Sequence, residues 1–337
     1  MIPCRNEEKF IARCLDSILT ISYPLDNIEV FVCDGMSDDN SRNIIEGYTG
    51  GSNSKSESNR ITLLDNPSKT TQHALNLGIN RSSGDFIIIL GAHAELDYDY
   101  ITNCLEAFSK DDKLGCVGGV IENIYEDNQS KGIGYAMSSP FGVGNAFFRT
   151  GKKEGYVDTV AFGMYKKEVF DKIGLFDEEL VRNQDDEFNF RLTKSGYKIY
   201  LSRSIRSKYY VRSSFVKLFR QYYQYGYWKV FVNKKHKTIT TLRQLIPFLF
   251  VSWLILGGVL SLIIPEIWVL YILANSLYFG LVILFGLLKS INPMIVPSIW
   301  LSFFILHISY GLGYLEGIWQ FVILNNAPKK KSEQLTR

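Results

Sequence analysis

The stretch Ile28-Glu29-Val30-Phe31-Val32-Cys33-Asp34-Gly35-Met36-Ser37-Asp38-Asp39 decides the fold of this chain. Its first half is rich in β-branched and aromatic residues and predicts a strand, which stops at the turn-forming pair Asp34-Gly35. Ser37-Asp38-Asp39 is typical of a helix cap and predicts a helix that runs to about Tyr48. A strand followed directly by a helix indicates the repeating unit of an α/β fold.

The same unit recurs on both sides of this stretch. Before it, apolar residues at the spacing of one helix face predict an amphipathic helix over residues 7–20. After a Gly/Ser/Asn-rich surface loop at 50–59, we expect strand 61–64, helix 70–80, strand 86–90, helix 98–109 and strand 116–121. The run 86–90 is apolar throughout, as expected for a strand buried on both faces. This alternation predicts an α/β fold with a mostly parallel sheet covered by helices on both faces.

Ligands of such sheets bind beyond the carboxyl ends of the strands. Asp34 and the run Gly91-Ala92-His93-Ala94-Glu95 occupy two of those ends. Residues 122–165 are Gly-rich and predict long connections, which in a compact domain are more often functional than not. Residues 197–201 predict a further strand.

The stretch Asn183-Gln184-Asp185-Asp186-Glu187-Phe188-Asn189-Phe190-Arg191-Leu192 predicts a helix that begins with three acids and is stopped by Gly196. Acids are favoured in a first turn because the free N–H groups there carry partial positive charge, and that alone explains an isolated stretch. The functional alternative is that one of the three is a catalytic base.

Charge and hydropathy are unevenly distributed along the 337 residues. The net charge of +3 is too small to argue for a nucleic-acid partner. Residues 241–327 hold very few charged side chains, and their three apolar segments, at about 243–264, 267–288 and 296–324, reach the ~20 residues that a membrane-crossing helix needs. Residues 213–232 mix aromatic and basic side chains, which predicts a helix in the membrane interface.

We therefore expect a cytoplasmic catalytic domain at 1–212, an interfacial helix and basic linker at 213–240, a membrane region at 241–326 and a basic tail at 327–337. Lysines flank the apolar region on both sides, and such lysines usually mark the cytoplasmic side of a membrane. Three crossings would place the two groups on opposite faces, so either the last lysines lie outside or one segment is re-entrant. Five scattered cysteines without a CxxC pair fit a reducing cytosol, and no cleavable signal is visible.

Several of these stretches resemble one family. Ile2-Pro3-Cys4-Arg5-Asn6-Glu7-Glu8 and Val32–Asp39 are similar to the opening of the family 2 glycosyltransferases, which have a GT-A fold. The narrower resemblance is to the glucosyltransferase subgroup of succinoglycan-type exopolysaccharide synthesis. It is carried by Gly142-Val143-Gly144-Asn145, Val157-Asp158-Thr159, Asn183–Leu192, Arg220–Trp228 and Leu306–Gly313.

The resemblance implies a set of nucleotide-sugar contacts. Pro3, Arg5, Glu7, Gly91 and Ala92 would line the nucleotide-sugar pocket. Asp34 would accept the uracil N3–H, a task that suits a carboxylate because it accepts without donating; as a structural alternative it is only a turn former. Lys69 would lie near the diphosphate, or else is a solvated surface lysine.

The resemblance also implies a divalent cation, Mn²⁺ or Mg²⁺, at a D-x-D or D-A-H motif. Here the motif is Gly91-Ala92-His93, so its leading carboxylate is missing. His93 and Glu95 remain as metal ligands, since Mn²⁺ accepts imidazole as well as oxygen. The alternative is that metal binding is reduced or lost.

On the acceptor side, Asp185 stands where the family has the aspartate of its E-D motif, with Gln184 in place of the Glu. The resemblance makes Asp185 the catalytic base, with Asp186 second and Asp158 near the acceptor. Gln221, Gln224 and Tyr225 correspond to a Q-x-x-R-W/Y element that closes over the diphosphate, with Gln224 replacing its Arg; alternatively they belong to an interfacial aromatic belt.

Together these features predict an inverting, multi-pass glycosyltransferase of the cell (inner) membrane with its catalytic domain in the cytoplasm. It would move a hexose, glucose from UDP-glucose, onto a polyprenyl-diphosphate-linked sugar, alongside other glycan-assembly enzymes. Two alternatives stay open: a non-catalytic membrane-tethered protein that binds sugar nucleotides or glycolipids, favoured by the departures at Gly91, Gln184 and Gln224, and a transferase that uses a different nucleotide sugar.

Overall fold

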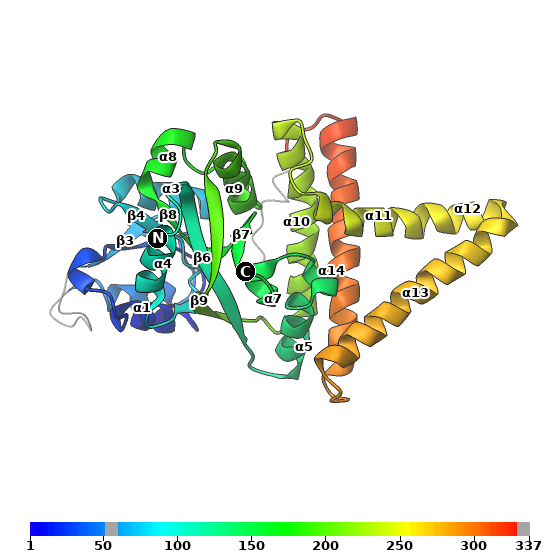
Figure 1. The fold of residues 1–337 in the computed structure, drawn as a ribbon, viewed down its shortest axis with the longest axis horizontal. Helices are drawn as coiled ribbons and strands as arrows, with labels where there is room; N and C mark the ends of the chain where they lie inside the picture. Colours follow the sequence, from blue (N-terminus) through cyan, green and yellow to red (C-terminus); the bar gives the residue numbers. More distant parts are fainter. Residues whose placement is uncertain (51–59, 329–337) are drawn as a thin grey trace. The chain divides into compact units, whose positions relative to one another are not determined.

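The computed structural model describes residues 1–50 and 60–328, so most of the predicted loop at 50–59 and of the basic tail lies outside the described residues. The chain forms two compact units (Figure 1). The first, the α/β unit, comprises Met1–Asn123 and Phe147–Tyr210. The second, the helical unit, comprises Ile124–Ala146 and, among the described residues, 211–328. The segment Ile124–Ala146 therefore belongs to the helical unit, although the sequence placed it within the catalytic domain expected at 1–212.

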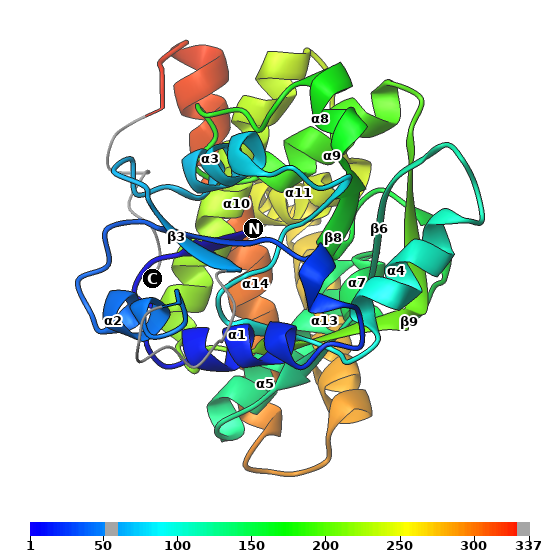
Figure 2. The same cartoon turned by 90° about the vertical axis from the view of Figure 1, so that its left-hand side faces the viewer.

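The α/β unit begins with a parallel three-stranded sheet of β1 (Ile2–Cys4), β2 (Val30–Asp34) and β3 (Ile61–Asp65), in which Ile2 pairs with Val32. Its helices are α1 (Ile11–Leu19), α2 (Ser41–Glu46) and α3 (Thr71–Arg81) (Figure 2). The predicted apolar face of α1 is buried, through Ile11, Cys14, Leu15 and Ile18. The sequence prediction was therefore accurate for this part of the chain.

The second sheet has the strand order β4-β8-β6-β9-β5, with β7 on β9, and its pairs β4–β8, β6–β8, β5–β9 and β7–β9 are antiparallel. Its strands are β4 (Phe86–Ile88), β5 (Ala94–Leu96), β6 (Leu114–Ile124), β7 (Gly155–Val157), β8 (Ala161–Lys166) and β9 (Lys198–Tyr210). The prediction of a mostly parallel sheet was wrong here, because helical crossovers do not alternate with these strands as they do with β1–β3. The fold is a mixed α/β sheet, and Leu90 N–H joins its two parts by donating to the Met1 carbonyl at 2.9 Å.

Three helices complete the α/β unit around this second sheet: α4 (Tyr100–Phe108), α8 (Lys167–Ile173) and α9 (Gln184–Lys194), with the single turn α7 (Phe147–Thr150). The expectation that the strand at 86–90 is buried on both faces was wrong at its start, since Phe86 is 38% exposed. Gly196 follows α9 with φ +90°, as its predicted role as a helix stop requires.

The Gly-rich segment 122–165 is more ordered than predicted. It contains α5 (Asn128–Met137), α6 (Pro140–Val143), α7, β7 and β8. The missed signal is at Asp127, whose side chain accepts from Ser130 N–H at 2.7 Å while Ser130 Oγ receives Asp127 N–H. This capping box starts α5 despite the glycines that lower its helix propensity.

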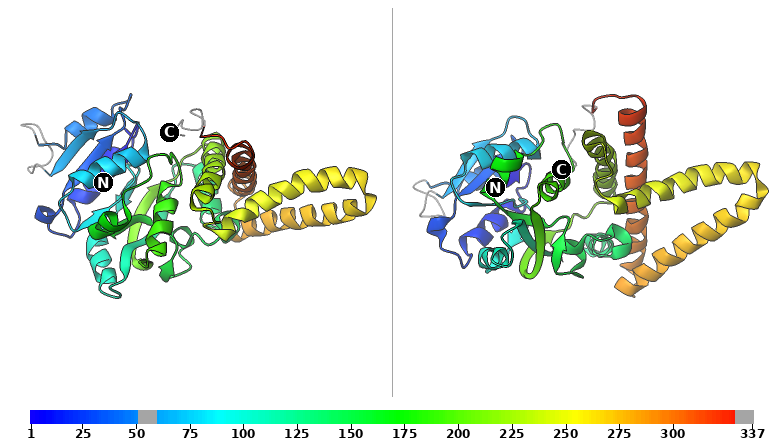
Figure 3. Two further views of the ribbon diagram at one scale, coloured as in Figure 1. Left: turned by 90° about the horizontal axis from the view of Figure 1, so that it is seen from above. Right: turned by 45° about the horizontal axis from the view of Figure 1, so that its top comes forward.

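The helical unit contains α10 (Phe215–His236), α11 (Ile246–Ser252), α12 (Gly258–Ile263), α13 (Pro265–Lys289) and α14 (Val296–Gly317). Three continuous helical stretches are long and apolar enough to cross a membrane: Leu242–Ile263, Pro265–Lys289 and Val296–Ile323. They match the three predicted segments. The first two meet at Ile264 to form a long hairpin (Figure 3).

Helix α10 packs on α14 along a seam of glycines. A Cβ on Gly226 would lie 2.0 Å from the Tyr310 carbonyl oxygen, and one on Gly313 would lie 2.0 Å from the Tyr223 carbonyl oxygen. Only glycine permits this backbone-to-backbone approach. The sequence predicted an interfacial helix at 213–232 but not the fixed partner that covers one of its faces.

Candidate active site

Asp34 ends β2 with its side chain fully buried. Ser37 Oγ donates to Asp34 Oδ1 at 2.5 Å, and the Arg42 guanidinium lies 3.6 Å from Oδ2. The Asp34 carbonyl accepts Asn66 N–H at 2.8 Å, which fixes the turn after β3 beside it. Such contacts hold a buried carboxylate in one orientation and balance its charge. A contact between Asp34 and a uracil base remains a prediction.

The loop after β1 is tied to the loop after β2. Asn6 adopts φ +55°, and its side-chain oxygen accepts Asp38 N–H at 2.8 Å. Arg5 lies 3.7 Å from the Asp38 carboxylate, and Glu7 N–H donates to Ser41 Oγ at 2.7 Å. The predicted residues Arg5 and Glu7 are thus brought to the same strand ends as Asp34, and Pro3 is buried one step earlier within β1.

Glu7 reaches the end of β4 through His93. The His93 Nδ1 atom lies 3.2 Å from Glu7 Oε1, and the imidazole packs edge-on against Tyr209 at 5.1 Å between centroids. Gly91 and the buried Ala92 precede His93, and a Cβ on Gly91 would lie 3.3 Å from the Phe162 ring. The predicted nucleotide-sugar residues of β1, β2 and the 91–93 run therefore meet in one region.

Lys69 is exposed on the turn between β3 and α3, with φ +61°. Its N–H donates to the Asn66 carbonyl at 3.0 Å, and Asn66 is the residue hydrogen-bonded to the Asp34 backbone. The turn that carries Lys69 therefore starts beside the candidate nucleotide site. A role at the diphosphate remains a prediction.

The two expected metal ligands have separate partners. His93 faces Glu7, whereas Glu95 accepts from the Tyr210 hydroxyl and lies 3.4 Å from Lys208 Nζ. Burial and then the hydrogen bond to Glu95 raise the pKa of Tyr210, which keeps that donor protonated. Within residues 1–50 and 60–328, no group of three His, Cys, Asp or Glu side chains is arranged to hold a metal ion.

The acidic start of α9 presents its three carboxylates differently. Asp185 is exposed and Asp186 is half-buried, whereas Glu187 is buried and paired with Arg191 at 2.7 Å. Arg191 also donates to the carbonyls of Ile173 and Leu175, so the pair of Glu187 and Arg191 holds α9 to the end of α8 and the segment after it. Asp185 is therefore the most exposed of the three acids, and its role as the catalytic base remains a prediction.

A buried hydrogen-bond network that the sequence did not predict lies one helical turn after Asp185 on α9. Asn189, one turn later on α9, accepts from the Tyr165 hydroxyl at 3.1 Å and donates to Thr159 Oγ1 at 3.1 Å. Burial, then the charges of Cys116 and Asp185, raise the pKa of Tyr165 well above its ordinary value. The sequence signal that could have pointed to Asn189 is its i+4 spacing from Asp185, because residues four apart lie on the same face of a helix.

The same network brings the predicted residue Asp158 into this region. Asp158 is exposed and directly precedes Thr159, whose hydroxyl receives the Asn189 amide. The connection between β7 and β8 is therefore fixed to α9 one turn from Asp185. Asp158 and Asp185 both carry exposed carboxylates on these two joined segments.

The remaining predicted residues lie on α10, in the helical unit. Gln221 donates through its amide to the Tyr225 hydroxyl at 2.8 Å, and Tyr225 packs edge-on against Tyr222 at 5.4 Å. Gln224 follows on the same helix. These contacts do not distinguish a role at the donor diphosphate from a role in an interfacial aromatic belt.

A mixed sheet with a buried acid at the end of its second parallel strand, and an exposed acid at the start of a later helix, fits the GT-A arrangement that the sequence predicted. Residues 1–174 match the model of glycosyl transferase family 2. The chain belongs to this family, and its activity is that of a glycosyltransferase.

Two relatives match nearly the whole chain. A dolichyl N-acetyl-α-D-glucosaminyl phosphate 3-β-D-2,3-diacetamido-2,3-dideoxy-β-D-glucuronosyltransferase of Methanococcus voltae is 31% identical over 94% of this chain and 96% of its own length. The succinoglycan biosynthesis protein ExoA of Rhizobium meliloti is 26% identical over 95% of this chain and 94% of its own length.

A solved structure has the same fold. The mannosyltransferase PcManGT of Pyrobaculum calidifontis, in complex with GDP-Man and Mn²⁺, superposes with a TM-score of 0.64. The match covers 94% of this chain and 86% of that one, at 15% sequence identity. The fold prediction is confirmed, as is the predicted resemblance to succinoglycan-type enzymes.

Proposed function

We propose that the chain is a membrane-bound inverting transferase that moves a hexose, glucose from UDP-glucose, onto a polyprenyl-diphosphate-linked sugar. The observation that carries the proposal is the exposed Asp185 carboxylate at the start of α9, in the same unit as the buried Asp34; α9 itself is joined to Tyr165 and Thr159 by Asn189. In this proposal Asp34 holds the uracil of the donor, and Asp185 is accessible to the acceptor hydroxyl.

In this reaction, Asp185 removes the proton of the acceptor hydroxyl while that oxygen attacks the anomeric carbon. The bond from this carbon to the donor diphosphate breaks, and its electron pair leaves with UDP. Direct displacement inverts the anomeric configuration. Asp186 and Asp158 hold the acceptor, and Asp34 fixes the donor through its uracil N3–H.

A divalent cation would neutralise the leaving diphosphate, as Mn²⁺ in the mannosyltransferase complex suggests for this fold. The residues of this chain do not fit the usual site: Gly91 has no side chain, His93 faces Glu7, and Glu95 faces Tyr210 and Lys208. We therefore assign no step to a metal ion. His93 and Glu95 stay candidate ligands only if both exchange their present partners.

A lipid-linked acceptor is supported by the helical unit and by the acceptor named for the Methanococcus enzyme. Membrane-spanning helices keep a catalytic unit at the surface from which a lipid-linked sugar extends. In our proposal the membrane is the cell membrane, the catalytic unit is cytoplasmic, and Gln221, Gln224 and Tyr225 approach the donor diphosphate. The three spans serve as an anchor.

A second donor is favoured by a specific observation. The Methanococcus relative, at 31% identity, transfers an acidic diacetamido sugar according to its name, whereas the succinoglycan protein is 26% identical. A UDP-linked diacetamido-uronic acid is therefore the second candidate donor.

The test is a donor screen with purified full-length protein in lipid nanodiscs and a polyprenyl-linked sugar acceptor. We expect UDP release with UDP-glucose that depends on the acceptor and yields an inverted linkage. Release only with UDP-diacetamido-uronic acid would support the second donor. Tight binding of UDP-sugars without turnover of any donor would contradict both proposals.

A further inference from the structure

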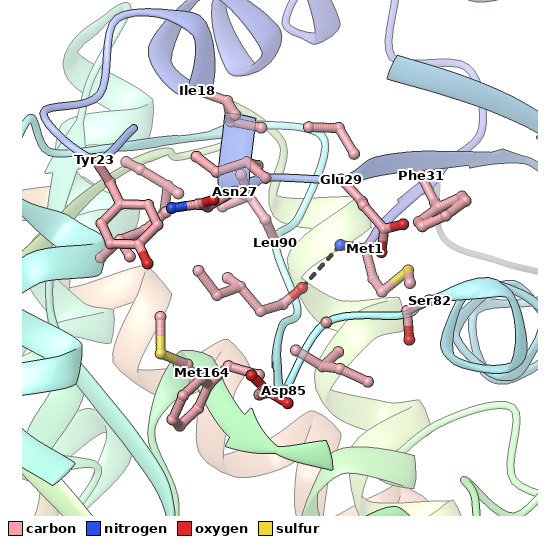
Figure 4. A pocket seen from close by; sticks show the side chains of 18 of the residues that line it. Met1, Ile18, Tyr23, Asn27, Glu29, Phe31, Ser82, Asp85, Leu90 and Met164 are labelled. Carbon is pink, nitrogen blue, oxygen red and sulfur yellow. Dashed lines mark hydrogen bonds between the residues drawn. The ribbon is translucent and has the colours of Figure 1, made fainter. Parts of the chain in front are cut away.

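Apolar surface outside the candidate site occurs in two places. One is a cavity of about 650 Å³ beside Met1 in the α/β unit, with Ile18, Tyr23 and Leu90 in its wall (Figure 4). The other is the outside of the helical unit, where large apolar side chains are exposed along whole helices. Only this second surface is extensive enough to meet a membrane.

The hairpin formed by Leu242–Ile263 and α13 is apolar on all sides. On α13, the consecutive residues Trp268, Val269 and Leu270 are all exposed, so no face of the helix is covered there. At 1.5 Å per residue, the 22 residues of Leu242–Ile263 reach about 33 Å, enough to cross a hydrocarbon core of ~30 Å. The hairpin therefore suits hydrocarbon on every face.

Helix α14 differs, because other parts of the helical unit cover one of its faces from end to end. Near its start, Ser298 Oγ donates to the Gln129 carbonyl of α5 at 3.4 Å. At the end of the stretch, Lys234 Nζ of α10 donates to the Phe321 carbonyl at 2.6 Å. Contacts with α6 and the glycine seam with α10 cover the length between them.

The covering helix α10 brings charges to the middle of this stretch. Gly226 meets Tyr310, which is near the middle of Val296–Ile323. Arg220 and Lys229 lie within two turns of Gly226 on α10. If α14 crossed the membrane, these cations would lie near the centre of the hydrocarbon, where charged side chains are costly.

The uncovered face of α14 is an apolar stripe. Its residues recur every three or four positions and are exposed or half-buried: Leu301, Phe304, Ile308, Leu312, Leu315 and Trp319. The polar residues Ser302, Ser309 and Gln320 are instead buried on the protein side. A helix with an apolar face outward and polar protein segments on its other face suits the plane of the membrane interface.

The hairpin leaves α14 crosswise instead of running alongside it (Figures 1 and 3). At the base of the hairpin, Gly286 meets Trp300 of α14. Nearer the tip, Tyr271 packs on Trp253 of the hairpin itself, at 5.8 Å between ring centroids. A membrane that the hairpin crosses therefore runs along α14.

We propose that only the hairpin crosses the membrane and that α14 lies in the interface, with its apolar stripe on the hydrocarbon of one leaflet. The chain then crosses twice, so the described residues before Leu242 and after Ile323 lie on the same side. This inference goes beyond the proposed function, because the third candidate span anchors the protein without crossing. It also removes the conflict between three crossings and the lysines that flank the apolar region.

Cysteine variants of the full-length protein test the number of crossings. The five native cysteines are buried, so an introduced exposed cysteine reports alone. Thr238→Cys lies before the hairpin, Glu266→Cys at its tip and Ala327→Cys after α14. With the catalytic unit in the cytoplasm, a membrane-impermeant maleimide added to intact cells should label Glu266→Cys alone, and permeabilisation should expose the other two.

Labelling of Ala327→Cys from the side opposite to Thr238→Cys overturns the proposal. So does a Glu266→Cys variant that is labelled from neither side or from the side of Thr238→Cys. The reverse pattern, in which intact cells label Thr238→Cys and Ala327→Cys but not Glu266→Cys, supports two crossings and contradicts only the cytoplasmic location in the proposed function.

Spin labels measure the depth of α14 directly. Leu301→Cys, Leu312→Cys and Trp319→Cys carry them in full-length protein in phosphatidylcholine–phosphatidylglycerol vesicles, and Leu277→Cys in the middle of α13 is the control. We expect similar shallow depths of about 5–10 Å along the stripe and a greater depth at the control. A crossing helix would separate Leu301 from Leu312 by about 16 Å in depth, and that result overturns the proposal.

Discussion

The two sheets of the α/β unit place their acids in opposite ways. In the parallel sheet, Asp34 is fully buried and held by Ser37 and Arg42. Beside the antiparallel sheet, Asp185 is exposed, and the hydrogen bonds of Asn189 one turn later hold its helix to Tyr165 and Thr159. A group that orients a nucleotide base needs a fixed position, whereas a group that takes a proton must be accessible to the acceptor.

This difference also explains where the chain departs from its family. Gly91 and Gln184 both follow the parallel β1–β3 sheet in the chain, whereas Arg5, Glu7 and Asp34 within it agree with the family pattern. The interlocked loops after β1 and β2 allow little variation, because Asn6, Ser37, Asp38 and Ser41 bond across them. The loops that carry Arg5, Glu7 and Asp34 are therefore the more constrained part of the predicted donor site, whereas Gly91 in the same predicted site departs from the family pattern.

The largest effect is expected for Asp185→Asn. The amide cannot take the acceptor proton, so turnover should fall about 10²- to 10⁴-fold while UDP binding is unchanged. Turnover is measured as UDP release and binding by calorimetry. Asp186→Asn is the matched control with a smaller loss, and a larger loss in that control would transfer the base role to Asp186.

Asp34→Asn tests the other half of the comparison. The amide still accepts through its oxygen, but it loses the charge that strengthens the bond to uracil N3–H. UDP affinity should fall about 10- to 100-fold, with less effect on turnover at saturating donor. Asp38→Asn, an exposed acid in the same loop, should change UDP affinity far less. Equal effects of the two variants would argue against a specific base contact.

Asn189→Ala tests the hydrogen bonds that join α9, one turn after Asp185, to Tyr165 and Thr159. It leaves the Tyr165 and Thr159 hydroxyls without this partner, and a buried polar group left unpaired costs about 1–3 kcal/mol of unfolding free energy. Thr193→Ala on the same helix removes only an exposed hydroxyl bonded to its own backbone and should change stability by less than about 0.5 kcal/mol. Denaturant unfolding followed by tyrosine fluorescence distinguishes them.

The smallest effect is expected at the surface pair of Asp111 and Lys198, 2.7 Å apart. The hydrogen bond from Lys198 lowers the pKa of Asp111 below its ordinary value, so the pair stabilises the fold above about pH 4 and this contribution is lost as the pH falls. Asp111→Asn should lower the Tm by no more than about 2 °C at pH 7. The difference should shrink in acid, and a constant difference would mean that charge is not its cause.

Local sequence patterns predicted the parallel sheet well because each of its elements satisfies a local rule. The strand at 28–33, the turn at Asp34-Gly35 and the face of α1 are all present. The antiparallel sheet was missed because its pairings join residues far apart in sequence, such as Glu95 with Lys208. Nothing local to β5 indicates a partner more than a hundred residues away.

The helical unit shows the same limit. Hydropathy alone located the three candidate spans, because spanning requires about 20 apolar residues whatever their neighbours are. It did not locate the partners of the ionisable side chains in the third candidate span. His307 lies 2.9 Å from the Tyr278 hydroxyl, and Glu316 accepts from Tyr223.

The sequence by itself determined the class of the protein: an α/β glycosyltransferase unit with candidate membrane helices. It also predicted Asp34 and Asp185 as the key acids of the site, a prediction that the variants above test. The tertiary structure decided which acid is exposed, which partners occupy His93 and Glu95, and how Asn189 joins α9 to Thr159. The reason is physical. Propensity and periodicity act over a few neighbouring residues, whereas burial and hydrogen-bond partners depend on chain segments that meet only when the sheet assembles.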